Sequence, residues 1–197
     1  KKQLYGEAYL VRFADDFLIM FQYERDAQRV YEAIIKRMEL FGLELSKEKT
    51  RILPFGRYSV SRETFDFLGF THFNSKTRKG YYTVGHKISR KKKKQFKSNL
   101  KKWVKENRNT QFDEFMKALN KKLTGSFNYY SLSGMIKEVR NLWIHSLYVT
   151  FKWLNRRSQR KSFKLEKFYE IWNDRIIRPY IHVDIWSGDK VIYNKNV

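Results

Sequence analysis

Two short apolar runs near the start of the chain are separated by only three residues. Residues 8–13 (Ala-Tyr-Leu-Val-Arg-Phe) and 17–22 (Phe-Leu-Ile-Met-Phe-Gln) are rich in aromatic and branched side chains, and Ala14-Asp15-Asp16 lies between them. Runs of this composition with so short a connection are typical of the strands of a tight β-hairpin. The second run is mostly apolar, so we expect its strand to be buried on both faces.

Asp15 and Asp16 place two carboxylates side by side at the tip of this predicted hairpin. Burying like charges together costs free energy unless a cation accompanies them, and two-residue hairpin turns favour Asn-Gly or Asp-Gly over Asp-Asp. Carboxylates at this spacing suit Mg²⁺, which proteins hold with one or two carboxylates plus substrate phosphates. Two such ions promote in-line phosphoryl transfer. The pattern therefore predicts a metal site, with a plain solvent-exposed turn as the alternative.

The segment after the hairpin predicts a helix and then further extended stretches. Asp26 is placed to cap a helix that runs to about Phe41, and Gly42 is placed to end it. Residues 43–46 and 50–53 are then predicted to be extended, and residues 65–70 (Phe-Asp-Phe-Leu-Gly-Phe) alternate like a strand. This order of elements predicts an α+β layer.

From about Lys87 onward the pattern changes to that of helices. Apolar residues at helical spacing predict four helices, over about 89–107, 111–123, 133–157 and 164–173. We therefore expect three parts: an α+β domain over residues 1–85, a helical domain over residues 86–183, and a tail over residues 184–197.

Positive charge is concentrated in the later part of the chain. Residues 1–70 hold 12 Lys and Arg against 11 Asp and Glu, whereas residues 71–197 hold 30 against 9. Such a surplus most often neutralises nucleic-acid phosphates, although an anionic membrane surface would also accept it. No apolar run reaches the ~18 residues of a membrane span, and the lack of Cys excludes a Cys-based zinc site. We expect nucleic acid, and no membrane, as the partner.

Two segments carry much of this surplus. Residues 86–109 contain eleven Lys and Arg and one Glu, and residues 152–164 contain six and no acid. We predict that the first is a helix whose basic face follows a phosphate backbone, and that arginines of the second contact phosphates or stack on bases. A merely solvated helix face is the alternative. The predicted nucleic-acid-binding residues are Lys91, Lys92, Lys93, Lys94, Lys97, Lys101, Arg156, Arg157 and Arg160.

Five blocks of the sequence resemble, in order, the reverse transcriptases encoded by group II introns. Residues 10–19 (Leu-Val-Arg-Phe-Ala-Asp-Asp-Phe-Leu-Ile) resemble the aromatic-Ala-Asp-Asp motif of that family. Residues 42–50 and 65–70 resemble later blocks of its palm. Residues 119–125 with Tyr129-Tyr130, and residues 153–160, resemble its maturase segment, also called the thumb or domain X. The resemblance covers residues 5 to about 183.

The resemblance implies a partial right-hand polymerase palm, made of antiparallel strands and a helix, followed by an α-helical thumb. It implies an RNA-directed DNA polymerase in which Asp15 and Asp16 bind Mg²⁺, with dNTPs and a template–primer duplex as substrates. Lys49 would protonate the leaving pyrophosphate, and Phe13, Leu68 and Gly69 would contact the primer. The implied partners are RNA, including the intron RNA in a maturase role, and DNA. The family usually has Tyr where this chain has Phe13.

The family's metal site also needs a third carboxylate from an earlier strand, and its fingers hold the incoming nucleotide. The sequence shows neither, and it begins with Lys1 rather than Met. We therefore expect a fragment, inactive alone, of a bacterial enzyme that works in the cytoplasm with its ribonucleoprotein. The main alternative is a non-catalytic RNA-binding splicing factor that uses the basic thumb. A retron-type reverse transcriptase is a third possibility.

Overall fold

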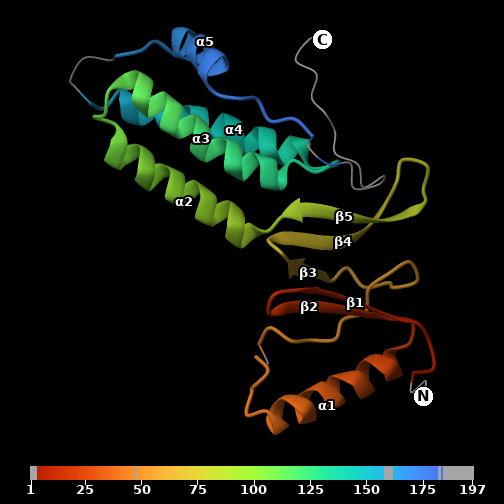
Figure 1. Cartoon of the computed structure of the whole chain (residues 1–197). Coiled ribbons are helices and arrows are strands. Elements are labelled where there is room, and N and C mark those ends of the chain that lie inside the picture. The colour runs from red at the N-terminus through yellow and green to blue at the C-terminus, as the bar shows by residue number, and fades with distance from the viewer. Residues whose placement is uncertain (1–3, 47, 158–161, 182, 184–197) are drawn as a thin grey trace. The chain divides into compact units, whose positions relative to one another are not determined.

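The computed structural model describes residues 4–46, 48–157, 162–181 and 183 of the chain. The described part has antiparallel strands and five helices, which confirms the mixed composition expected from the sequence (Figure 1). It divides into two compact units. The first unit consists of residues up to Leu68 together with residues 72–85, and the second consists of residues 69–71 and the chain from His86 onward.

The first unit begins with the predicted hairpin. Strands β1 (Ala8–Phe13) and β2 (Asp16–Phe21) pair antiparallel, with Phe13 opposite Asp16 and Ala8 opposite Phe21. Helix α1 (Glu24–Leu40) packs against β2. The expectation that β2 is buried on both faces is wrong, because its side chains are half-buried or exposed and those of β1 are all exposed. Helix α1 covers only one face of the two-stranded ribbon, so among the described residues of this unit the other face has no helix against it.

The ends of α1 follow the sequence signals only in part. Asp26 is not the N-cap; the helix starts after Tyr23, and Asp26 lies in its first turn. The Asp26 side chain is buried, and its Oδ2 atom accepts hydrogen bonds from the backbone N–H groups of Tyr5 and Gly6, both at 3.0 Å. Gly42 ends the helix as predicted, with φ of +66°, while the Leu43 N–H donates to the Met38 carbonyl at 2.9 Å.

We expect Asp26→Ala to lower the stability of the first unit by about 1–3 kcal/mol, because two backbone N–H groups lose their shared acceptor. Asp26→Asn keeps one acceptor oxygen and should cost less. Urea denaturation followed by circular dichroism measures both. Equal stability of the wild type and the Ala variant would show that these hydrogen bonds contribute nothing.

Three further strands form a second sheet. Strands β3 (Thr64–Phe67), β4 (Phe70–Lys76) and β5 (Tyr82–Ile88) lie in that order. The single strand expected over residues 65–70 is therefore two strands, with a turn at Leu68-Gly69. The extended stretches expected at 43–46 and 50–53 are not strands in the structure, and β5 falls where the sequence suggested only a domain boundary. Short connecting segments of this kind carry little periodicity, which explains both errors.

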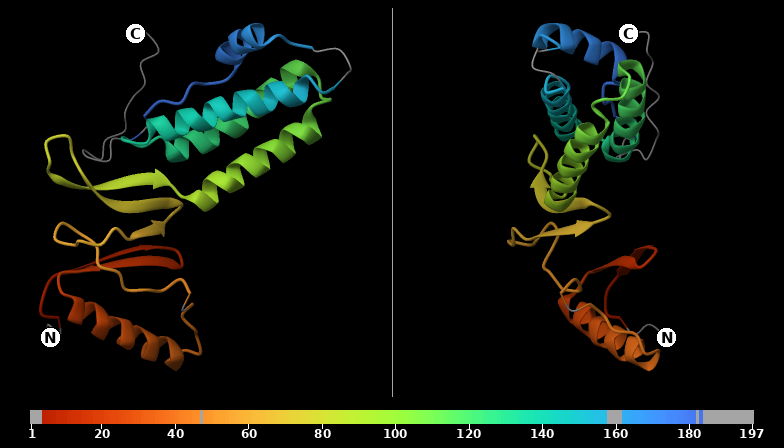
Figure 2. Two further views of the ribbon diagram at one scale, coloured as in Figure 1. Left: turned by 180° about the vertical axis from the view of Figure 1, so that it is seen from behind. Right: turned by 90° about the vertical axis from the view of Figure 1, so that its left-hand side faces the viewer.

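The second unit contains the remaining four helices of the described chain. These are α2 (Arg90–Asn107), α3 (Phe112–Tyr130), α4 (Ile136–Leu154) and α5 (Leu165–Arg175). The views in Figures 1 and 2 show α2, α3 and α4 running alongside one another. The four predicted helices are confirmed, although α3 continues seven residues beyond its predicted end at residue 123 because Gly125 does not interrupt it. No described helix is long and apolar enough to cross a membrane.

The core of the second unit is apolar and aromatic. Its largest fully buried side chains include Trp172, Phe115 and Phe168, which come from α5 and α3. The indole N–H of Trp143, on α4, donates to the Ile177 carbonyl at 3.1 Å. The core leaves the lysines of α2 on the outside of the unit, and the predicted tail at 184–197 lies outside the described residues.

Candidate metal-binding hairpin and nucleic-acid interface

Asp15 and Asp16 lie at the turn between β1 and β2, as the sequence predicted. Phe13 pairs with Asp16, so Ala14 and Asp15 are the two turn residues. Ala14 has φ of +51°, a conformation that residues with a Cβ atom rarely adopt, whereas Asp15 has no positive φ. The Arg12 Nε–H donates to the Ala14 carbonyl at 2.9 Å and holds the turn from one side. Both Asp residues are exposed.

The two carboxylates fit part of a Mg²⁺ site. The carboxylates of Asp15 and Asp16 form no hydrogen bond or ion pair with another described residue, so their oxygens are available to a cation. Proteins usually hold Mg²⁺ with one or two carboxylates, and phosphates and waters complete its octahedron. Within the described residues, no group of three or more His, Asp or Glu side chains could hold a metal ion. Asp15 and Asp16 therefore match only part of the donor set that the resemblance implies, which includes a third carboxylate.

Phe13 and Lys49 are the other predicted catalytic and primer residues of the first unit. Phe13 is 64% exposed beside the turn. Lys49 is also exposed, in a turn where its N–H donates to the Ser46 carbonyl at 3.0 Å. No hydrogen bond or ion pair between described residues joins Lys49 to Asp15 or Asp16. Its role as a general acid stays a prediction.

Leu68 and Gly69, predicted to contact the primer, form the tight turn between β3 and β4. Their φ values are +50° and +82°, and a turn with positive φ at both central residues is a type I′ hairpin turn. A left-handed Leu costs about 1–2 kcal/mol, so this conformation stores strain. A Cβ atom on Gly69 would stand 3.4 Å from the Tyr130 hydroxyl and 3.5 Å from Cγ of Lys92. Gly69 is therefore packed against α2 and α3 of the helical unit.

The basic face of α2 is the main candidate for a nucleic-acid interface. Lys91, Lys92, Lys94, Lys97 and Lys101 are all exposed. The first turn of α2 contains no acid, although the helix dipole favours acids there and disfavours cations. Ser89 caps the helix by accepting from the Lys92 N–H at 3.3 Å. Cations in the first turn lower the stability of α2, and a bound anion would offset this loss. This supports a phosphate as the ligand.

Lys93 differs from its neighbours on α2. Its ammonium group forms an ion pair with Glu138 on α4 at 2.9 Å, and it is half-buried. The other oxygen of Glu138 accepts from the backbone N–H of Ile88 at 2.7 Å. Lys93 therefore ties α2 to α4, and a phosphate would have to compete with Glu138 for it.

The predicted arginines after α4 lie close to the end of α2. Arg156 is exposed and Arg157 is half-buried, whereas Arg160 lies outside the described residues. Arg108, which follows α2, donates to the Arg156 carbonyl at 3.5 Å. The list of predicted nucleic-acid-binding residues left out Arg90, Lys105 and Arg108. The spacing of Arg90, Lys94, Lys97, Lys101, Lys105 and Arg108, in steps of three or four, is the signal that could have found them.

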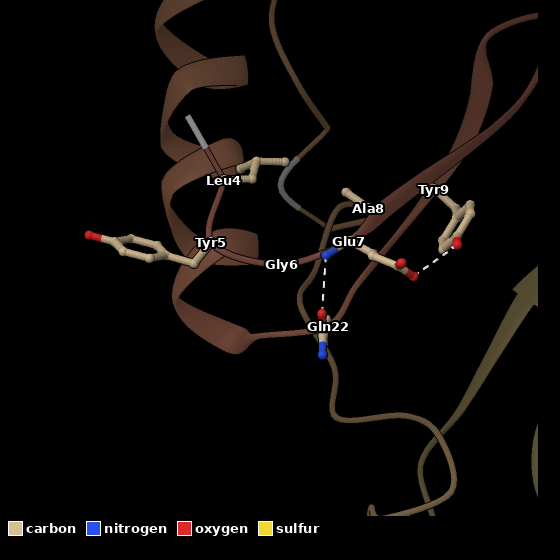
Figure 3. Close-up of a pocket in the computed structure, with 7 residues that line it drawn as sticks. All are labelled: Leu4, Tyr5, Gly6, Glu7, Ala8, Tyr9 and Gln22. Atoms are coloured by element: carbon tan, nitrogen blue, oxygen red, sulfur yellow. Dashed lines mark hydrogen bonds between the residues drawn. The ribbon is translucent and has the colours of Figure 1, made fainter. Parts of the chain in front are cut away.

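Two open hollows lie elsewhere. One is at the start of β1, lined by Leu4, Gln22 and neighbouring residues (Figure 3). Its single acid, Glu7, accepts from the Tyr9 hydroxyl at 2.9 Å, and this hydrogen bond raises the pKa of Tyr9. The other hollow, of about 450 Å³, lies between α2 and α3 with Lys92 and Lys122 on its lining. The first lies at the other end of β1 from Asp15 and has no reactive cluster.

His145 on α4 lies near the cationic face of α2. Its burial, and then the charge of Lys97, lower its pKa below the usual 6.5. Below pH 6.5 the unfolded chain therefore binds a proton more readily than the folded chain, so stability is full above that pH and falls as the pH drops.

We accordingly expect the free energy of unfolding of the helical unit to fall between pH 7.5 and pH 5.5. His145→Gln should reduce this fall, while the pKa of His86, which burial also lowers, accounts for part of what remains. Urea titrations at the two pH values measure the difference. An unchanged pH dependence in the variant would exclude His145 as a cause.

Comparison with known protein families agrees with this geometry. A family model described as reverse transcriptase (RNA-dependent DNA polymerase) matches residues 1–72, which contain the Asp15-Asp16 hairpin. A second, described as the group II intron maturase-specific domain, matches residues 93–171, which contain most of α2 and all of α3 and α4. No curated protein matches the chain.

The first match places the chain among reverse transcriptases. Together, the two matches in this order span most of the chain and show that it belongs to the group II intron reverse transcriptase/maturase family.

Proposed function

We propose that this chain is the later palm and the thumb of a group II intron RNA-directed DNA polymerase that also binds its intron RNA. Residues 1–85 would carry the metal-binding hairpin and the primer contacts. Residues 86–183 would hold the template–primer duplex and structured intron RNA. The exposed, acid-free basic face of α2 is the observation that carries the RNA-binding half of this proposal.

Asp15 and Asp16 would hold Mg²⁺ in the polymerase. The ion, when bound, neutralises charge that develops on phosphate oxygens during nucleotidyl transfer. Their exposure and lack of partners in the described chain keep both carboxylates available for this role. Phe13, beside them, would contact the primer end, and dNTPs and DNA would be the substrates.

The helical unit would bind RNA chiefly through phosphates. Arg90, Lys94, Lys97, Lys101 and Lys105 repeat at intervals of three and four residues, so they form one row along α2. At 1.5 Å per residue the row is about 22 Å long. Each phosphate that it neutralises releases counterions, and this release makes binding depend on salt.

Fluorescence anisotropy with a labelled RNA hairpin tests this proposal. The affinity is measured at KCl concentrations from about 50 to about 300 mM. Contacts from five cations predict that log K falls with log salt at a slope of about −3.5 to −4.5. An affinity independent of salt, or no binding at the lowest salt, would contradict it. Comparing the affinity for the hairpin with that for a double-stranded DNA of equal length shows whether the chain prefers RNA to DNA.

A further inference from the structure

The end of the helical unit where α2 and α4 stop contains a tryptophan surrounded by cations. Trp153, on α4, is half-buried. Lys105 Nζ lies 5.8 Å from the centroid of its ring, and the Cζ atoms of Arg108 and Arg156 lie 5.5 and 5.4 Å from it. Two separate basic segments of the sequence thus meet at one aromatic side chain.

The three cations lack a compensating acid. Among the described residues, none of Lys105, Arg108 and Arg156 forms an ion pair with a carboxylate. Glu106 is adjacent to Lys105 in sequence but forms no ion pair with any of them. Each cation is attracted to the π-face of Trp153, yet the cations repel one another. An anionic ligand at this place would relieve that repulsion.

The combination of groups selects one kind of ligand. A phosphate alone would use the cations but not the ring, and the bases of a regular duplex are stacked on each other and cannot reach an indole. An unpaired nucleotide uses both, because its base stacks on an aromatic or guanidinium plane and its phosphates accept from Lys and Arg. We propose that Trp153 with Lys105, Arg108 and Arg156 is a binding site for an unpaired RNA nucleotide.

The site continues the row of cations on α2. Lys105 belongs both to that row and to the Trp153 cluster. A duplex whose backbone follows the row therefore reaches Trp153 where α2 ends. The ligand of the combined surface is a junction at which RNA changes from paired to single-stranded. This inference rests on the proposed RNA binding by α2 and adds a preference for such junctions.

Two labelled probes test the site: a blunt RNA hairpin, and the same hairpin with a tail of four uridines. For the wild-type chain we expect the tail to raise affinity about tenfold, within the range of one stacked base. Trp153→Leu should abolish this gain and leave the affinity for the blunt hairpin unchanged. Trp153→Phe should keep part of the gain, and a tail of abasic residues should give the wild type none.

Further variants keep the test decisive. Trp103→Leu is the matched control, since Trp103 is also a half-buried indole with a lysine, Lys122, at 5.8 Å, and it should retain the gain. Should Trp153→Leu unfold, Lys105→Ala with Arg156→Ala must lose the gain instead. If folded Trp153→Leu keeps the gain in affinity, or if an abasic tail gives the wild type the same gain, the proposed nucleotide site at Trp153 is wrong. Neither result contradicts the binding of RNA by α2. Failure to bind the blunt hairpin contradicts the proposed function itself.

Discussion

The 197-residue chain alone is expected to leave a DNA primer unextended on an RNA template, even with Mg²⁺ and all four dNTPs present. The hairpin supplies two exposed carboxylates, Asp15 and Asp16. In the described part of the chain no third acid lies with them to complete a metal cluster. In-line transfer with two metal ions needs both the attacking and the leaving oxygen to be held. Denaturing gels with radiolabelled primer measure the yield.

The double variant Asp15→Asn, Asp16→Asn is the control for this prediction. It should be indistinguishable from the wild type in extension and should bind the RNA hairpin equally well, because its substitutions lie outside the basic helices. Extension by the wild type that the double variant abolishes would mean that the 197 residues form a complete metal site. The chain would then be an active enzyme, and the inference that its set of metal ligands is incomplete would be wrong.

Replacing Lys94, Lys97 and Lys101 together by Ala should weaken binding of the RNA hairpin roughly 100-fold. Each lost phosphate contact costs about 1 kcal/mol, and 1.4 kcal/mol is tenfold in affinity. The slope of log K against log salt should become shallower by about 2–3. All three lysines are exposed and form no ion pair with a described residue, so the fold should remain intact.

A variant with Lys117, Lys121 and Lys167 replaced by Ala is the matched control. These lysines are exposed on α3 and α5, and their removal changes the net charge by the same amount. The control should bind RNA within about threefold of the wild type and keep its slope within about 1. Equal losses in both variants would show that net charge alone, rather than the face of α2, determines binding.

The local elements of the fold could be predicted because their signals are local. The hairpin followed from two apolar runs with a short connection, and the end of α1 at Gly42 followed from the left-handed conformation that Gly adopts there. The helical unit followed from apolar periodicity. The two carboxylates of the candidate metal site were likewise visible as adjacent residues.

What the sequence could not predict depends on contacts between distant residues. Asp26 looked like a helix cap, but its carboxylate binds the backbone of Tyr5 and Gly6, some 20 residues earlier. The apolar composition of β2 suggested burial, yet the described chain covers the hairpin on only one side. The Trp153 cluster joins side chains about 50 residues apart, so no spacing rule could indicate it.

The structure also changes how the basic residues are interpreted. The four consecutive lysines of residues 91–94 were all predicted from the sequence to bind nucleic acid. In the fold, Lys93 is paired with Glu138, whereas the row from Arg90 to Lys105 is exposed and leads to Trp153. The non-catalytic splicing-factor alternative uses the same surface, so RNA-binding experiments support both possibilities. Absence of primer extension by this chain is likewise expected under both.

Photocrosslinking tests the central claim most directly, that RNA lies along the cationic row of α2. An RNA hairpin with 4-thiouridine in both its stem and its tail is irradiated with the wild-type chain, and cross-linked peptides are identified by mass spectrometry. We predict stem cross-links within residues 90–108 and tail cross-links within residues 153–157. Cross-links confined to residues 8–85, or to α5, would contradict the assignment of α2 as the RNA-binding surface.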